Sequence, residues 1–258
     1  MKIAGKILIS FTAAYLIAAP AYFTSLIDEI RCRNIVIDIA DSPENNLITE
    51  NEILNIVRDA VPSLAGSRIS DIRLCDIETR LKERREIKTA EVYFTINGSI
   101  CVFIRQRAPI MRIITEEGDY FIDDEGILIR KRKLYTPRLH VVGGNVVLNR
   151  PVLDGLSILD TAAKNKVLRD IFILVNYLRN DRYWSAQIDQ LWVDEKGEID
   201  MIPRTGSHII HLGTIDNYVE KLENLEAFYL KILPLAGWDA YKRINLEFEN
   251  QIVCNKKQ

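Results

Sequence analysis

The sequence predicts an α+β protein in which a single membrane-spanning helix precedes a small β-α-α-β-β module and a larger, mostly antiparallel β domain with covering helices. Three observations predict this fold class: an uncharged stretch near the N-terminus, an Asn-Gly hairpin preceded by two helical periodicities, and many short alternating strands towards the C-terminus. The length of 258 residues fits one or two domains. A hydrophobic content of 48% and a charged content of 27% exclude collagen-like and wholly disordered chains.

Charge and cysteine spacing exclude two further classes of protein. The 34 Lys+Arg and 36 Asp+Glu residues leave a net charge of -2, without the basic excess that nucleic-acid binding requires. The closest pair of cysteines in the sequence is Cys75 and Cys101, so a zinc ribbon or a redox CxxC motif is excluded. We therefore expect neither nucleic acid nor a cofactor as a ligand.

The first element is an uncharged run at residues 7–27, close to the roughly 20 residues that cross a bilayer as a helix. Lys2 and Lys6 place the short tail, residues 1–6, in the cytoplasm by the positive-inside rule. A cleaved signal peptide is the alternative, because Ala19-Pro20-Ala21 has the form of a cleavage site. The retained anchor is preferred, since the apolar run continues beyond that site. Both interpretations export the rest of the chain.

The first exported module covers residues 31–107. Its opening strand, Asn34–Ile39, alternates isoleucine with other residues. Thr49 and Glu52 then have the spacing of a capping box at the start of a helix, and a second helix carries Leu74 to Leu81. Two alternating strands follow around Asn97-Gly98, which predicts a β-hairpin with a type I′ turn.

The order β-α-α-β-β after an anchor resembles a POTRA domain. The segments from Ile87 to Val92 and from Gln106 to Ile110 are similar to the corresponding part of the FtsQ/DivIB family of bacterial division proteins. Downstream segments at 120–126, 135–144 and 244–253 resemble family segments in the same order. Gln106 is a departure, because a glutamate is common there in the family. We expect this departure to affect local capping.

The second module, residues 108–258, is predicted to begin with an antiparallel meander. Its four strands are expected at residues 110–115, 120–122, 127–129 and 139–142. An apolar face on residues 162–180 predicts a helix that covers the sheet. Further strands are expected at residues 187–193, 198–202 and 208–212, and a last helix at residues 215–232.

Several residues in this module suggest catalysis or metal binding, but their context favours structural roles. His208 and His211 are three residues apart in the sequence. On a strand, side chains at this odd separation lie on opposite faces, so the two imidazoles would not meet. Residues 123–126, Asp-Asp-Glu-Gly, lack the spacing of a calcium loop and predict a hairpin turn. The serines lack the G-x-S-x-G context of a hydrolase. His208 and His211 could bind the same metal ion only if this segment formed a helix instead of a strand.

The resemblance implies a non-enzymatic scaffold of the division machinery in the cytoplasmic membrane, single-pass, with its bulk in the periplasm at the septum. It also implies small bitopic partners similar to FtsB and FtsL, and no small-molecule substrate. Two alternatives remain: a membrane-anchored enzyme that modifies the cell wall, and a POTRA component of polypeptide export. An enzyme would need titratable groups that converge in a cleft.

The C-terminal strand is predicted to bind the partner. Its alternation places Ile244, Leu246 and Phe248 towards the domain, and we expect the strand to lie at a sheet edge. A partner segment would then add to this edge by β-augmentation. The expected partner-binding residues are Tyr241, Arg243, Ile244, Asn245, Leu246, Glu247, Phe248, Glu249 and Gln251.

Overall fold

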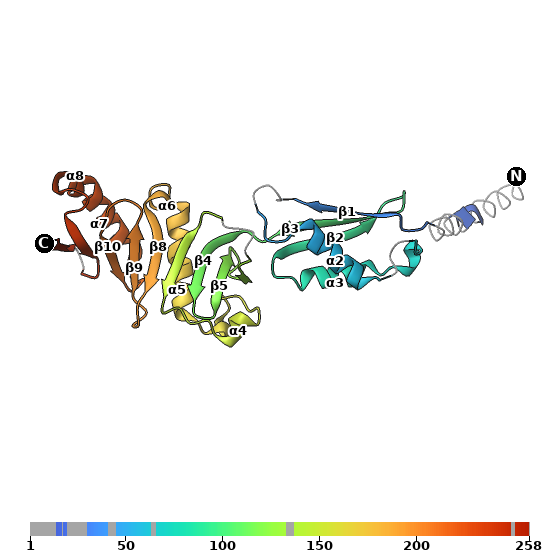
Figure 1. The fold of residues 1–258 in the computed structure, drawn as a ribbon, viewed down its shortest axis with the longest axis horizontal. Helices are drawn as coiled ribbons and strands as arrows, with labels where there is room; N and C mark the ends of the chain where they lie inside the picture. The colour runs from blue at the N-terminus through green and yellow to red at the C-terminus, as the bar shows by residue number, and fades with distance from the viewer. Residues whose placement is uncertain are drawn as a thin grey trace, which may run out of the picture. The chain divides into compact units, whose positions relative to one another are not determined.

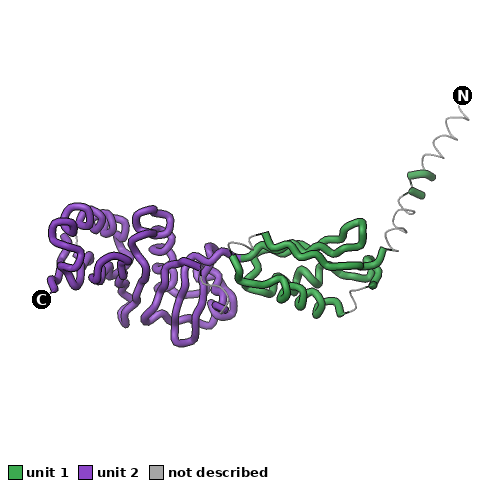
Figure 2. The backbone as a smooth tube through the Cα atoms, turned by 45° about the horizontal axis from the view of Figure 1, so that its top comes forward, with its two compact units in different colours: residues 1–106 green, residues 107–258 purple. Residues whose placement is uncertain are grey.

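The computed structural model describes residues 14–16, 18–19, 30–40, 45–62, 66–132, 137–248 and 251–257. The expected cytoplasmic tail and nearly all of the expected anchor at residues 7–27 lie outside the described residues. Within the described ranges, no helix combines the length and the apolar character that a membrane crossing requires. The chain divides into two compact units, residues 1–106 and residues 107–258 (Figure 2).

The first unit has the predicted order β-α-α-β-β. Its strands form a sheet in the order β1-β3-β2, in which β1 runs parallel to β3 and β2 runs antiparallel to it. Helices α2 and α3 lie on one face of this sheet (Figure 1) and bury Ile53, Val57, Ile77 and Leu81 against it. The elements are β1 Asn34–Ile39, α2 Glu50–Ala60, the 3-10 turn Ile69–Asp71, α3 Leu74–Lys82, β2 Ile87–Phe94 and β3 Ser99–Gln106.

The predicted capping box begins α2. The Thr49 side chain accepts from the backbone N–H of Glu52, and the Glu52 carboxylate accepts from the backbone N–H of Thr49 at 2.9 Å. This reciprocal pair satisfies two of the N–H groups that a helix start leaves open. The prediction from spacing alone is confirmed.

The β2–β3 hairpin is also confirmed, but its predicted turn type is wrong. Asn97 keeps a negative φ, whereas a type I′ turn needs positive φ at both central residues. Gly98 donates to the carbonyl of Thr95 and has a φ of 86°, which makes a type I turn followed by a left-handed glycine. A Cβ at Gly98 would lie 2.5 Å from the Arg31 carbonyl oxygen, so glycine is required there for space as well.

The second unit is built on a mixed sheet in the order β12-β11-β10-β9-β8-β7-β4-β5-β6. Figure 1 labels β10, β9, β8, β4 and β5 of this sheet. Its strands are β4 Pro109–Thr115, β5 Gly118–Asp123, β6 Leu128–Arg130, β7 His140–Gly144, β8 Ile188–Val193, β9 Ile199–Pro203, β10 Ile209–Gly213, β11 Tyr241–Asn245 and β12 Val253–Lys256. Its helices are α4 Arg150–Leu153, the 3-10 turn Thr161–Ala163, α5 Lys166–Asn180, α6 Trp184–Gln187, α7 Tyr218–Lys231 and α8 Leu233–Ala236.

Strand pairing corrects the predicted antiparallel meander at its fourth strand. Strands β4, β5 and β6 pair antiparallel in sequence order, as expected. Strand β7 instead returns to the free side of β4 and pairs with it in parallel, for example Arg112 with Val141. Among the described strands of this sheet, five of the eight neighbouring pairs are antiparallel and three are parallel.

The long helices provide the apolar cover for this sheet. The predicted face of α5 is buried, including Leu168, Ile171 and Leu174. The helix begins at Lys166 rather than at 162, because Lys164 adopts a left-handed conformation after a short 3-10 turn. Helix α7 buries Leu222, Leu225 and Tyr229 in the same core. This core fixes the far end of the sheet, where β10, β11 and β12 lie.

Candidate functional site

The edge of the sheet beside α7 is formed by β12 and not by β11. Strand β11 pairs in parallel with β10 through Ile244 and Ile210, and antiparallel with β12 through Ile244 and Cys254. The prediction that residues 244–248 form the edge strand is therefore wrong. Residues 244–248 carry the last strong alternation in the sequence, but the short strand Val253–Lys256, which the sequence prediction does not include, follows it and takes the edge.

The predicted partner-binding residues separate into buried and accessible groups. Ile244 and Leu246 are fully buried in the core, as their alternation predicts. Phe248 was expected to face the domain, but its side chain is 49% exposed. Tyr241 packs against Phe228 of α7. Gln251 is exposed, and Glu249 lies outside the described residues.

Strand β12 has the features of an accessible edge. Val253, Asn255 and Lys256 are exposed, whereas Ile252 and Cys254 pack against the core. Within the described residues, β12 pairs only with β11, so the other side of its backbone offers unpaired N–H and C=O groups. The alternation of Ile252 and Cys254 with exposed neighbours was the signal in the sequence that could have located this strand.

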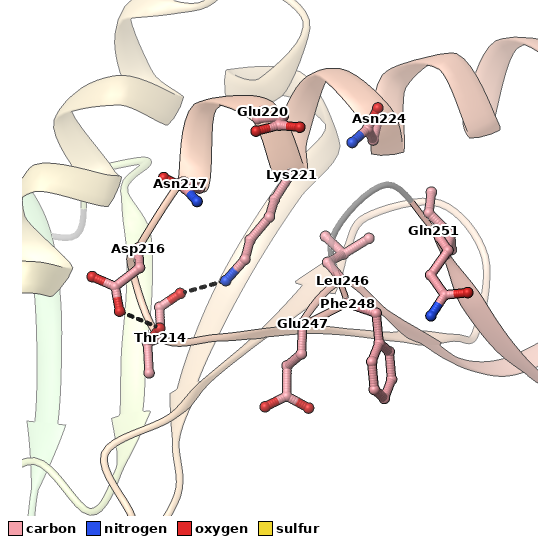
Figure 3. Close-up of a pocket in the computed structure, with 11 residues that line it drawn as sticks. Thr214, Asp216, Asn217, Glu220, Lys221, Asn224, Leu246, Glu247, Phe248 and Gln251 are labelled. Atoms are coloured by element: carbon pink, nitrogen blue, oxygen red, sulfur yellow. Dashed lines mark hydrogen bonds between the residues drawn. The ribbon is translucent and has the colours of Figure 1, made fainter.

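A pocket lies next to this edge, between helix α7 and the segment that joins β11 to β12 (Figure 3). Its volume is about 190 Å³, below the roughly 300–1,000 Å³ of typical small-molecule sites. The ammonium of Lys221 donates to the carbonyls of Leu212 and Thr214 at 3.0 and 2.9 Å, which fixes one wall. Leu246, Phe248 and Gln251 form the opposite wall. The size suits a side chain of a partner better than a metabolite.

Histidine 211 lies at the centre of a charged cluster on β9, β10 and the segment after β11. Its Nδ1 lies 2.6 Å from Asp200, and its Nε2 lies 3.2 Å from Glu247 and 3.8 Å from Glu198. Arg243 contacts Asp200 at 3.0 Å. The amide of Asn245 donates to Glu247 and, together with the nearby His211, holds the pKa of the Glu247 carboxyl below its usual range.

Histidine 208 belongs to a different environment, as its odd separation from His211 predicts. Its Nε2 lies 2.6 Å from the hydroxyl of Tyr229 on α7, inside the core. Burial lowers the pKa of His208 and raises the pKa of Tyr229. The prediction that the two imidazoles face opposite sides of the strand is confirmed.

The acidic run at 123–126 forms the predicted hairpin turn. The Oδ1 of Asp123 accepts from the backbone N–H groups of Glu125 and Ile127 at 3.0 and 2.7 Å. Its Oδ2 accepts from Arg107 at 2.6 Å, and the side chain is fully buried. A carboxylate held in this way shapes the β5–β6 turn, so the structure gives it a structural role.

These observations define a protein with an α/β unit of β-α-α-β-β order, followed by a mixed-sheet unit that ends in an accessible strand. Comparison with protein families agrees with both parts. A family described as "POTRA-like domain" matches residues 30–105, and one described as "FtsQ/DivIB, C-terminal related" matches residues 108–255, more than half of the chain. The chain belongs to the FtsQ/DivIB family of cell division proteins. A comparison with curated proteins found no match.

Proposed function

We propose that this protein is a non-enzymatic scaffold of the bacterial division machinery that binds other division proteins through its extracytoplasmic units. The edge strand β12, with the small pocket beside it, is the observation that carries the proposal. An edge strand pairs with an extended partner segment through main-chain hydrogen bonds, and a neighbouring pocket selects one of its side chains. By family resemblance, the partners are small bitopic proteins similar to FtsB and FtsL.

The binding surface that we propose is revised from the one expected from sequence. Main-chain pairing is assigned to Val253–Lys256, because β11 has neighbours on both sides. Phe248 and Gln251 keep their proposed role, since both line the adjacent pocket. Glu247 lies at the same pocket and adds negative charge. The buried Ile244 and Leu246 act indirectly, by holding β11 in place.

Membrane attachment is part of the proposal. The uncharged run at residues 7–27 is long enough for one crossing, and Lys2 and Lys6 favour a cytoplasmic N-terminus. This topology exposes both units to the periplasm at the division site. There the chain would regulate septum assembly by holding its partners in place, a role that needs recognition surfaces and no catalytic group.

Localisation and co-purification test the proposal together. The full-length chain, carrying a tag, is followed in dividing cells and then isolated from detergent-solubilised membranes, and the bound proteins are identified by mass spectrometry. We expect enrichment at the septum, co-purification of small bitopic division proteins, and filamentous cells on depletion. Uniform membrane distribution together with normal division after depletion would contradict the proposed function.

A further inference from the structure

The cluster around His211 has the arrangement of a three-ligand metal site. Glu198, His211 and Glu247 each offer one ligand atom, and these atoms all lie within 4.8 Å of one another. The three residues come from the β8–β9 hairpin, from β10 and from the segment after β11. We propose that Glu198, His211 and Glu247 bind a divalent transition metal ion such as Zn²⁺, with Asp200 orienting the imidazole.

The hydrogen bond at Nδ1 supports this assignment. Asp200 lies 2.6 Å from Nδ1 and accepts from it, so in the neutral imidazole the proton sits on Nδ1 and Nε2 carries the lone pair. That lone pair is directed at two carboxylates, which are also acceptors when ionised. In the neutral imidazole Nε2 and the two carboxylates are all acceptors, and a cation bound between them removes their mutual repulsion. A carboxylate behind a metal-ligating histidine is the usual arrangement at zinc sites.

The distances within the cluster also accommodate a metal ion. A charged N–H···O bond from a protonated Nε2 is typically about 2.7–2.9 Å long. The Nε2 atom lies 3.2 Å from Glu247 and 3.8 Å from Glu198, both longer than that. Ligand atoms at about 2.0–2.2 Å from a tetrahedral ion lie roughly 3.3–3.6 Å from one another. The 3.2 Å separation lies about 0.1 Å below this range and the 3.8 Å separation about 0.2 Å above it, so small side-chain shifts bring these atoms to coordination distance.

The charges around His211 and the backbone geometry at Gly213 also support a metal site. The carboxylates of Glu198, Asp200 and Glu247 surround the imidazole of His211, Arg243 pairs with Asp200, and Lys221 attracts Glu247 from α7. A divalent cation between Glu198 and Glu247 would offset the repulsion between these two carboxylates. Gly213 has a φ of 70°, and a Cβ there would lie 2.7 Å from the Cγ of Glu247. A glycine at this position therefore allows Glu247 to lie across the end of β10.

Three protein ligands leave one coordination position for water or for another donor. Glu247 also lines the pocket beside β12, so a bound ion would fix the segment between β11 and β12 onto β9 and β10. This inference does not rest on the proposed division role, because ion binding is measured on the isolated protein.

The experiment uses the full-length protein in detergent, without a histidine tag and stripped of metal by a chelator. Zn²⁺ affinity is measured by competition with a chromophoric chelator, and Co²⁺ is added as a spectroscopic probe of coordination. We expect one ion per chain, the visible absorption of four-coordinate Co²⁺, and a rise in the melting temperature with Zn²⁺. The absence of stoichiometric binding would overturn the proposal.

Variants assign the ligands. Glu247→Gln changes a partly exposed side chain and His211→Gln changes the central ligand, and we expect each to weaken Zn²⁺ binding at least ~100-fold. Asp200→Asn should weaken it about 10- to 100-fold, as the loss of an orienting partner does. Glu195→Gln, on the same hairpin as Glu198, is the matched control and should bind as wild type. Wild-type affinity in a folded Glu247→Gln variant would contradict the assignment.

Discussion

The side-chain amide of Gln106 donates to the carbonyl of Asn45 at 2.7 Å, across the buried end of strand β3. The carbonyl oxygen of the same amide accepts from the backbone N–H groups of Leu47 and Ile48 at 2.8 and 3.0 Å. One side chain therefore satisfies both the donors and an acceptor of the loop that leads into α2. A glutamate at this position could accept the two N–H groups, but it could not donate to Asn45 when ionised.

Replacement of Gln106 by leucine should destabilise the first unit by about 2–3 kcal/mol, because three buried polar groups of the loop lose their partner. Arg105→Leu, at the exposed neighbouring position of β3, is the control and should cost less than about 0.5 kcal/mol. Urea unfolding of the full chain, followed by a probe in the first unit, measures both. Equal midpoints for the two variants would contradict the role of Gln106.

Asp123 gives a second stability prediction. Asp123→Ala should destabilise the second unit by about 2–3 kcal/mol, because it removes the buried carboxylate from Arg107, which keeps its contact with the half-exposed Glu125, and removes the acceptor from the β5–β6 turn. Asp124→Ala, at the exposed position of the same turn, should cost less than about 0.5 kcal/mol. Thermal melts of both variants distinguish them. We expect each folded variant to support division, and loss of division in a folded, correctly localised Asp123→Ala protein would argue for a functional carboxylate.

The pH dependence of stability follows from His208. Burial lowers its pKa in the folded state below the ordinary value of 6.5, so the unfolded chain binds the proton more readily. Its contribution is therefore fully present above about pH 6.5 and is lost as the pH falls towards the folded pKa. Melting temperatures between pH 7.5 and pH 5 should fall less steeply for His208→Gln than for wild type. Parallel curves would show that His208 titrates equally in both states.

The prediction that residues 7–27 are retained as a membrane anchor does not depend on the fold of the two units. If residues 7–27 remain as a membrane helix, the mature protein keeps its N-terminus and partitions with the membrane after a carbonate wash. Cleavage after Ala21 would instead give a product that starts at Tyr22. Intact mass measurement of the protein from membranes decides between them. We expect the uncleaved mass, and a species that starts at Tyr22 would contradict the anchor.

Local signals in the sequence were sufficient for most of the elements, though not for β12, because the groups that define those elements are close together along the chain. Thr49 and Glu52 form the capping box by themselves, and Gly98, Gly126 and Gly197 each close a hairpin with a left-handed residue. Capping boxes and tight turns depend on a few neighbouring residues and little on distant parts of the fold. The helix and strand order followed from them.

The parallel pairings and the His211 cluster could not be predicted in the same way. Strand β7 reaches β4 across a long connection, and the sequence alternation of β7 suits an antiparallel partner as well as a parallel one. His211 meets Glu198, Asp200 and Glu247 only because β9, β10 and β11 are neighbours in the sheet. The position of β11 also depends on β12, whose four residues give a weak periodic signal.

Strand β12 is proposed to bind a partner through its backbone. Lys257 donates its N–H inward to Ala240 at 3.1 Å, so alternation along the strand directs the N–H of Lys256 outward. Lys256→Pro removes this outward donor while the pairing with β11 is kept. Lys256→Ala keeps the donor and removes only the side chain, which makes it the matched control.

The most direct test is the dissociation constant of the full-length protein and its two Lys256 variants for the co-purified partner. All three proteins must first show similar melting curves. We expect Lys256→Pro to weaken binding about 10-fold or more, the equivalent of one lost main-chain hydrogen bond, and Lys256→Ala to stay within about 2-fold of wild type. Wild-type affinity in the folded proline variant would contradict this expectation and place the interface elsewhere on the molecule.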